Sequence, residues 1–230
     1  FQQEAVMSHN GWQYVVYYSG DRRVCLSRRC LPDGPWQTIV FTVYYFSGTD
    51  AHDVAGEGLC PNDGTIHLAF DHHGDTLHYR VSQAGAACEP GQMTWSAALF
   101  GPVRTWLEQE GKTVTQVTYP RFFQTPEGDM KLAYRYGSSG DGDSMLVDYD
   151  GATGTWSGSR MVIHRQGVFT DSLGTSYNRC AYPNGWHCGP DGTIHVTWVW
   201  RENATVGANP TFYVHPRAPA DREGCALVRS

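Results

Sequence analysis

The sequence predicts an all-β protein, a β-propeller made of four-stranded blades. Three observations predict it: a composition rich in turn residues, a seven-residue phrase that recurs four times, and a tryptophan near a further strand in three of the repeats. Of the 230 residues, 26 are glycine and 12 are proline, while 17% are charged and 13% are aromatic. Many short strands joined by turns fit this composition better than a helical bundle does.

The recurring phrase is a glycine, any residue, a long side chain, a polar or aromatic residue, an aliphatic residue, a small residue and an aromatic residue. It occurs as GWQYVVY (11–17), GTIHLAF (64–70), GDMKLAY (128–134) and GTIHVTW (192–198), in steps of 53, 64 and 64 residues. Three copies follow a tight turn, NDG, PEG or PDG. The glycine that opens each phrase is therefore expected to have a positive φ.

Further strands accompany each copy of the phrase. A second strand follows at 22–28, 76–82, 144–150 and 211–214, and a tryptophan lies near another strand at Trp36, Trp95 and Trp156. A sheet repeated at this spacing is the signature of a propeller blade, and a β-sandwich with coincidental similarity is the alternative. We therefore expect about four blades.

Charge and hydropathy narrow the classes of partner. The net charge is −6 and there is no run of five or six basic residues, so nucleic acid is not an expected partner. No apolar stretch approaches the roughly 18 residues of a membrane span. We expect a monomer in which residues 1–214 form the blades as a single, incomplete domain and residues 215–230 form an atypical tail. The start at Phe1, without an initiator methionine or a signal peptide, indicates a trimmed or partial chain.

The cysteines and one sequon suggest a secreted protein. The seven cysteines form no CxxC pair, and the sequon at 203–205 is an acceptor for N-glycosylation. A local disulfide between Cys25 and Cys30 is the first candidate for a bridge. Secretion is therefore predicted.

A second cysteine-containing group has ligand types that suit zinc. Cys180, His187, Cys188 and His195 offer thiolate and imidazole ligands at zinc-like spacing. A disulfide between Cys180 and Cys188, or simple burial, explains the same residues. No cofactor is clearly required, and a structural zinc or calcium ion stays open.

Several polar side chains occupy similar offsets from the repeated phrase. His72 and Arg135 lie eight and seven residues after its glycine, while His52, Tyr119 and Tyr177 lie in the segments that enter it. Equivalent positions of successive blades surround one channel, so all five are expected at one channel mouth. Tyr119 precedes a proline, which by itself predicts an extended strand.

The chemistry that suits this set is β-elimination from a uronic acid. An arginine can neutralise the carboxylate, a tyrosine or histidine can remove the C5 proton, and the same or another group can protonate the leaving O4. An adjacent arginine also lowers the pKa of a tyrosine. Glycoside hydrolysis needs paired carboxylates, for which Asp50, Asp53, Glu57 and Asp71 are the candidates.

Six segments carry a resemblance to a known family. They are TDAHD, GTIHLAFDHH, VTYPRFF, KLAYRYG, SYNRCAYPNG and GTIHVTWVWRE. Over about residues 8–214 the chain resembles the BNR-repeat-like, seven-bladed propeller polysaccharide lyases, a group that includes ulvan lyases and rhamnose-glucuronate lyases. The resemblance implies that His52 and His72 bind or deprotonate the uronate, that Tyr119 is both base and acid, that Arg135 neutralises the carboxylate, and that Tyr177 contacts substrate.

His73 and Arg121 are further predicted substrate-binding residues, while His67 is expected to be a sheet residue. The prediction is thus a secreted polysaccharide lyase acting by β-elimination on an acidic glycan that contains uronate and rhamnose. The alternatives are a carbohydrate-binding propeller, with Trp186, Trp198 and Trp200 as stacking platforms, and a sialidase-like hydrolase.

Overall fold

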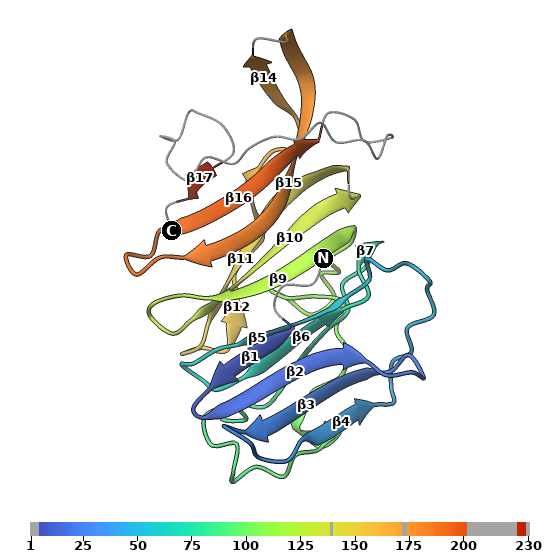
Figure 1. The fold of residues 1–230 in the computed structure, drawn as a ribbon, viewed down its shortest axis with the longest axis vertical. Coiled ribbons are helices and arrows are strands. Elements are labelled where there is room, and N and C mark those ends of the chain that lie inside the picture. Colours follow the sequence, from blue (N-terminus) through green and yellow to red (C-terminus); the bar gives the residue numbers. More distant parts are fainter. Residues whose placement is uncertain (1–4, 139, 172–173, 202–224, 229–230) are drawn as a thin grey trace.

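The structure, a computed structural model, describes residues 5–138, 140–171, 174–201 and 225–228. Side chains are described for the same residues apart from several in the last sheet, Tyr177 and Trp200 among them. Four antiparallel sheets follow one another along the long axis of the molecule, in the order of the sequence (Figure 1). The predicted all-β propeller with about four blades is confirmed.

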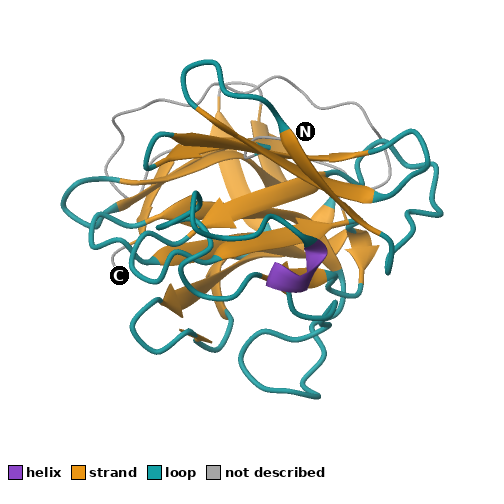
Figure 2. Ribbon diagram, turned by 90° about the horizontal axis from the view of Figure 1, so that it is seen from below, coloured by secondary structure: helices purple, strands orange, loops and turns teal. Residues whose placement is uncertain are grey.

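The first two sheets come from the first third of the chain. The first has the order β1 (Val6–His9), β2 (Trp12–Tyr18), β3 (Val24–Cys30), β4 (Gln37–Phe41). The second has the order β5 (Ala55–Leu59), β6 (Ile66–Phe70), β8 (Tyr79–Val81). The described helical structure is a single short turn, η1 (Ala97–Leu99), surrounded by strands and loops (Figure 2).

The last two sheets are larger. The third has the order β12 (Thr155–Trp156), β11 (Asp141–Asp150), β10 (Met130–Ser138), β9 (Val117–Gln124), β7 (His73–Asp75), and β13 (Arg160–Ile163) also pairs with β11. The fourth has the order β14 (Gly167–Asp171), β15 (Gly174–Cys188), β16 (Ile194–Arg201), β17 (Cys225–Val228). β7 follows a strand of the second sheet but pairs in the third, and so links the two.

The repeated phrase forms an inner strand of every sheet, with a partner on each side, namely β2, β6, β10 and β16. Its opening glycines have φ values of 75°, 67°, 89° and 79° at Gly11, Gly64, Gly128 and Gly192. A Cβ on Gly64 would lie 2.6 Å from the Cys88 sulfur, so both backbone conformation and space require glycine there. The prediction of positive φ after a tight turn is confirmed.

Apolar side chains form three core clusters, one between each pair of neighbouring sheets. Successive residues of one strand serve different clusters. Leu132 and Phe122 pack in the second, while Ala133 and Phe123 pack in the third, because side chains alternate across a strand. The two middle sheets are thus buried on both faces.

The disulfide predictions are wrong. The six cysteines whose side chains are described are free. Cys25 and Cys30 lie on the same strand, where their odd separation directs one into the core and leaves the other exposed. Cys180 and Cys188 both lie in β15, roughly 26 Å apart at about 3.3 Å per residue, far beyond the reach of a disulfide.

Some predictions fall on the C-terminal part of the chain. The sequon at 203–205, the strand at 211–214 and the boundary at 214 lie outside the described residues. β17, which belongs to the predicted tail, pairs with β16 as the outer strand of the fourth sheet. Within the described part of the chain, no helix has the length and apolarity to cross a membrane.

Candidate active site

The loop between β4 and β5, residues 42–54, carries two of the polar side chains at the centre of the site. It is held against the turn between β2 and β3. Arg22 Nη1 donates to the Gly48 carbonyl at 2.7 Å, and the Phe46 ring stacks on Tyr18 with centroids 5.0 Å apart. These anchors fix the loop although it has no regular structure.

Asp50 in this loop accepts hydrogen bonds from two histidines. His52 Nδ1 lies 2.5 Å from one carboxylate oxygen, which also accepts from the His52 backbone amide at 2.9 Å. His73 Nδ1 lies 2.6 Å from the other oxygen. The bonds from the His52 amide and ring, followed by that from His73, hold the pKa of Asp50 well below its usual range. An ionised carboxylate has only acceptor sites, so Asp50 can accept from the Nδ1 of both rings.

The two imidazoles stack on each other and face Tyr119. Their ring centroids are 4.6 Å apart, and Tyr119 lies 6.1 Å from the His52 ring and 5.7 Å from the His73 ring. His73 reaches this position because it pairs with Thr118 at the edge of the third sheet. Its Nε2 is buried and makes no hydrogen bond within the part of the chain that the structure describes.

A β-bulge directs Tyr119 toward the histidines. The register of β9 on β10 shifts between Ala133 and Arg135, so that Tyr119 and Pro120 both oppose Tyr134. Tyr119 has a φ of 53°, a left-handed conformation that is uncommon for a residue other than glycine. The strand predicted here is present, but Tyr119 itself is not extended. Bulges are often found where a side chain has to be redirected beside a site.

Tyr182 and Arg135 complete the cluster from the other side. The Tyr182 hydroxyl donates to the Tyr119 hydroxyl at 2.8 Å. The Arg135 guanidinium lies 4.6 Å from the Tyr182 ring centroid and 5.9 Å from that of Tyr119, and it donates to the Ala181 carbonyl. Burial raises the pKa of Tyr119, and Arg135 opposes this without offsetting it. The expected lowering by arginine is therefore outweighed, and Tyr119 is an un-ionised phenol.

His72 is placed differently from the other predicted site residues. Its side chain is 1% exposed, and its Nε2 accepts from the His78 backbone amide at 2.8 Å. Burial lowers its pKa well below the usual range. The structure thus brings His52, His73, Tyr119 and Arg135 together and directs His72 into the interior.

Arg121 lies beside the cluster, where its Nη1 donates to the Asn184 carbonyl and ties β9 to the bend of β15. With Tyr119, Arg135 and Trp186 it lines a narrow pocket. The Tyr177 side chain lies outside the described residues. The site is thus built from the loop between the first and second sheets, from β7, β9 and β10 of the third sheet and from β15 of the fourth.

Comparison with known proteins decides the family. A family model described as "BNR repeat-containing family member" matches residues 12–219. The chain belongs to this family. The predicted resemblance is thereby confirmed.

Two curated relatives of this family member are ulvan lyases. The long isoform from Pseudoalteromonas sp. (strain PLSV) is 29% identical over 67% of this chain and 19% of the relative. The short isoform from Alteromonas sp. (strain LOR) is 23% identical over 76% of this chain and 40% of the relative. The chain thus spans well under half of their lengths.

Solved structures show the same fold. The polysaccharide lyase Uly1 matches with a TM-score of 0.70 and 25% identity over 88% of this chain and 49% of that one. An ulvan lyase bound to -[GlcA(1-4)Rha3S]- matches with a TM-score of 0.62 and 16% identity over 87% and 46%. The chain spans about half of these lyases.

His67 in this family member lies in β6, as predicted for a sheet residue, and is fully buried. Its two ring nitrogens lie 2.6 Å from the hydroxyls of Thr65 and Tyr79. Burial lowers its pKa to about 3. A histidine with both nitrogens bonded inside the core is part of the packing.

The acidic side chains near the site are in unlike environments. Burial, together with the neighbouring Asp71, raises the pKa of Asp53 to about 6. Glu57 is 1% exposed within its sheet, and burial raises its pKa well above the usual range. Asp71 accepts from the Tyr44 hydroxyl. Asp50, bonded to both imidazoles, is the acidic group that belongs to the cluster.

Metal-ligand side chains gather at one place within the described part of the chain. Asp50, His52 and His73 have ligand atoms within 4.8 Å of one another, and these side chains already bond to each other. The predicted zinc group is not gathered in this way among the described residues. His187 pairs with His195 across β15 and β16, whereas Cys180 lies near the middle of β15 with its sulfur facing the Gly142 carbonyl.

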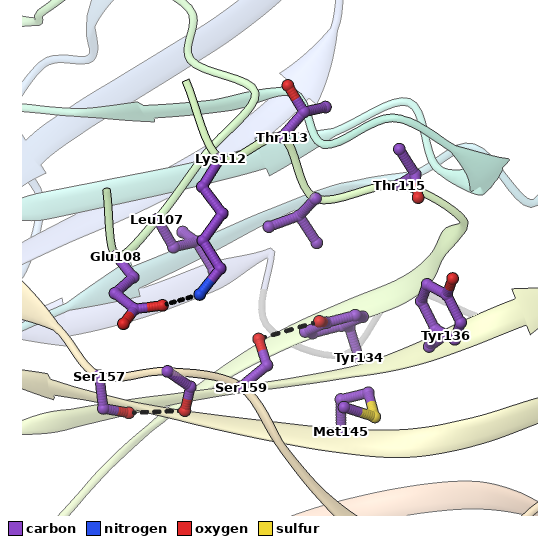
Figure 3. Close-up of a pocket in the computed structure, with 12 residues that line it drawn as sticks. Leu107, Glu108, Lys112, Thr113, Thr115, Tyr134, Tyr136, Met145, Ser157 and Ser159 are labelled. Carbon is purple, nitrogen blue, oxygen red and sulfur yellow. Dashed lines mark hydrogen bonds and ion pairs between the residues drawn. The ribbon is translucent and has the colours of Figure 1, made fainter. Parts of the chain in front are cut away.

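A larger pocket, of about 430 Å³, lies between the third sheet and the loop that precedes β9 (Figure 3). In it the Tyr134 hydroxyl donates to Ser159, and Lys112 pairs with Glu108 at 2.5 Å. No histidine or arginine lines this pocket. It therefore lacks the imidazoles and the guanidinium that the cluster around Tyr119 has.

Sequence reasoning missed two members of the cluster. The sequence predicts Asp50 only as a candidate hydrolase carboxylate and predicts no role for Tyr182. A signal for Tyr182 exists, because the dipeptide Tyr-Pro occurs at Tyr119 in β9 and again at Tyr182 in β15. These strands occupy corresponding places in adjacent sheets.

Proposed function

We propose that this protein is a polysaccharide lyase that cleaves a uronate-containing glycan by β-elimination. The observation that carries the proposal is the contact of two carboxylate-bonded imidazoles, His52 and His73, with the un-ionised phenol of Tyr119 beside the buried Arg135. This combination offers a base, an acid and a cation within one cluster. The ulvan lyases among the relatives support the same chemistry.

The mechanism assigns one role to each group. Arg135 neutralises the uronate carboxylate and stabilises the negative charge that develops as the C5 proton leaves. The Nε2 of a neutral imidazole takes that proton as general base. The C5–H electron pair then forms the C4–C5 double bond, the C4–O4 bond breaks, and Tyr119 gives its phenol proton to O4. The raised pKa of Tyr119 suits a proton donor.

The substrate is, in this proposal, an acidic polysaccharide in which glucuronate is linked to rhamnose. The names of the relatives support it, because they are ulvan lyases and one solved example is bound to -[GlcA(1-4)Rha3S]-. An acidic polysaccharide of this kind lies outside the cell, so we propose that the protein is secreted. We propose further that the protein acts as a monomer.

The alternatives are supported less well. A binding function would use exposed aromatic platforms, but Trp186 and Trp198 are 9% and 7% exposed and pack in the third core cluster. A hydrolase would need two carboxyl groups flanking the sugar, yet Asp50 is bonded to two imidazoles and Glu57 is enclosed in its sheet. Elimination uses the groups that do converge.

The test is the nature of the product. We expect incubation with a glucuronate-rhamnose polymer to give chain shortening together with the ultraviolet absorbance of an unsaturated uronate. A neutral polymer is the control and should stay intact. Reducing ends without the absorbance would indicate a hydrolase. Glycan binding without either signal would indicate a binding protein, and both results would contradict the proposal.

A further inference from the structure

We propose that Asp50 is a positioning residue that fixes His52 and His73 together in the tautomer with hydrogen on Nδ1, which puts the lone pair of each neutral ring on Nε2. The catalytic role of this tautomer rests on the proposed function, but the tautomer itself does not. It concerns which ring nitrogen carries the proton, which can be measured in the free protein.

Each oxygen of the Asp50 carboxylate is hydrogen-bonded to a different imidazole ring. One oxygen lies 2.5 Å from His52 Nδ1 and the other lies 2.6 Å from His73 Nδ1. The rings stack with centroids 4.6 Å apart and an interplanar angle of 24°. Because one rigid group bonds to both, the two Nε2 atoms cannot be oriented independently of each other.

The chemistry of the carboxylate decides the tautomer. An ionised carboxylate has only acceptor sites, so each Nδ1 has to donate. In a neutral imidazole the other nitrogen then carries the lone pair. For His73 this Nε2 is buried and has no hydrogen-bond partner within the described residues. A buried acceptor without a partner is costly, and a substrate C–H or hydroxyl would give it one.

Neighbouring carboxylates do not substitute for Asp50. Asp75 accepts from the His73 backbone amide at 2.9 Å and therefore acts on the main chain of the same histidine. The loop that carries Asp50 is held from the first sheet by Arg22. The position of the carboxylate is thus set before substrate binds, as expected of a group that orients others.

The direct test is the tautomer of each ring in the free protein. Protein labelled with ¹⁵N at histidine would be studied by two-bond ¹H–¹⁵N correlation at about pH 8.5, well above the ordinary imidazole pKa of about 6.5. His52→Gln and His73→Gln assign the signals. We expect hydrogen on Nδ1 in both rings. Hydrogen on Nε2 of either ring in the unmodified protein would overturn the proposal.

Asp50→Asn provides the second test. An amide accepts through its oxygen but donates through its nitrogen, so it can satisfy only one Nδ1–H. We expect at least one ring to change to the Nε2–H tautomer, and kcat to fall by about 10²-fold with little change in KM. Asp75→Asn is the matched control and should keep both tautomers. Retention of both Nδ1–H tautomers in Asp50→Asn would contradict the proposal.

The two proposals fail in different ways. If the unmodified protein gives no unsaturated product from any uronate polymer, the proposed function fails. The tautomer spectra still report on Asp50 in that case. If the product forms but Asp50→Asn leaves spectra and kcat unchanged, the elimination stands and the role of Asp50 fails.

Discussion

Two histidines, His67 and His73, lie six residues apart in the sequence and differ in the hydrogen-bond partners of their ring nitrogens. His67, in β6, has hydroxyl partners on both ring nitrogens and packs edge-on against Tyr149 and Trp156. His73, just beyond the end of the same strand, has a carboxylate on Nδ1 and no hydrogen-bond partner on Nε2 among the described residues. Both ring nitrogens of His67 thus have hydrogen-bond partners, whereas Nε2 of His73 is available to a substrate.

Burial alone therefore does not distinguish a structural histidine from a reactive one. His67 is fully buried, and His73 has a side chain only 22% exposed. What differs is the partner of the second nitrogen. A hydroxyl on each side closes the hydrogen-bond network of His67, whereas the carboxylate of Asp50 orients His73 and leaves it open toward Tyr119.

The largest expected effect separates two adjacent residues. His73→Gln should lower kcat/KM by about 10²- to 10³-fold, because it removes a general base or its orienting partner, while stability changes little. His72→Gln should leave kcat/KM within a few-fold and lower the free energy of unfolding by about 1–3 kcal/mol, because the His78 amide loses its acceptor inside the core.

Steady-state kinetics and urea unfolding of both variants would measure the two effects. The reverse pattern, with His72→Gln inactive and His73→Gln active, would place His72 rather than His73 in the site.

The next effect concerns His67 and pH. Its pKa is lowered by burial from 6.5 to about 3, so the unfolded chain binds the proton more readily than the folded protein does. The contribution of the neutral His67 to the free energy of unfolding is therefore fully present above pH 6.5 and is lost as the pH falls toward 3. At about 1.36 kcal/mol per pKa unit, this loss amounts to roughly 5 kcal/mol. His72, whose pKa is lowered in the same direction, adds to it.

His67→Gln should therefore flatten the fall in stability between pH 6.5 and 3, while destabilising the protein by about 2–3 kcal/mol at pH 8 through its lost hydrogen bonds. Urea unfolding across this pH range measures both quantities. An unchanged slope with pH would show that His67 is already charged in the folded protein, which contradicts a closed network.

Local rules made much of the fold predictable. The strands β2, β6, β10 and β16 follow from alternation of side chains after a turn, and the glycine that opens each needs a positive φ. Both signals act over a few residues, so a single sequence contains them. The third core cluster, with Trp186 and Trp198 inside it, depends on packing between sheets and could not be read in this way.

The different positions of His72 and His73 show why the site was harder to predict than the fold. Counting residues from Gly64 assumes that side chains keep alternating beyond Phe70. Asp71 instead has a φ of 63° and is held by Tyr44, which breaks the alternation and exchanges the faces of the residues that follow. Asp is among the few residues that adopt this conformation, but the sequence does not show where it does so.

Tyr119, on the other side of the cluster, also has a backbone conformation that its local sequence does not predict. A residue before proline is biased toward the extended region, yet Tyr119 is left-handed within a bulge. The segment was correctly predicted as a strand, and the direction of its side chain depends on the register between β9 and β10. Functional sites are where such local rules are expected to fail.

Tyr119→Phe is the most direct test of whether Tyr119 gives its phenol proton to the leaving O4. Tyr136→Phe, in the same sheet and lining the larger pocket, is the matched control. We expect Tyr119→Phe to lower formation of the unsaturated product by about 10³-fold while glycan affinity stays within a few-fold, and the control to keep full activity. Full activity of Tyr119→Phe on a glucuronate-rhamnose polymer would show that Tyr119 is not the proton donor.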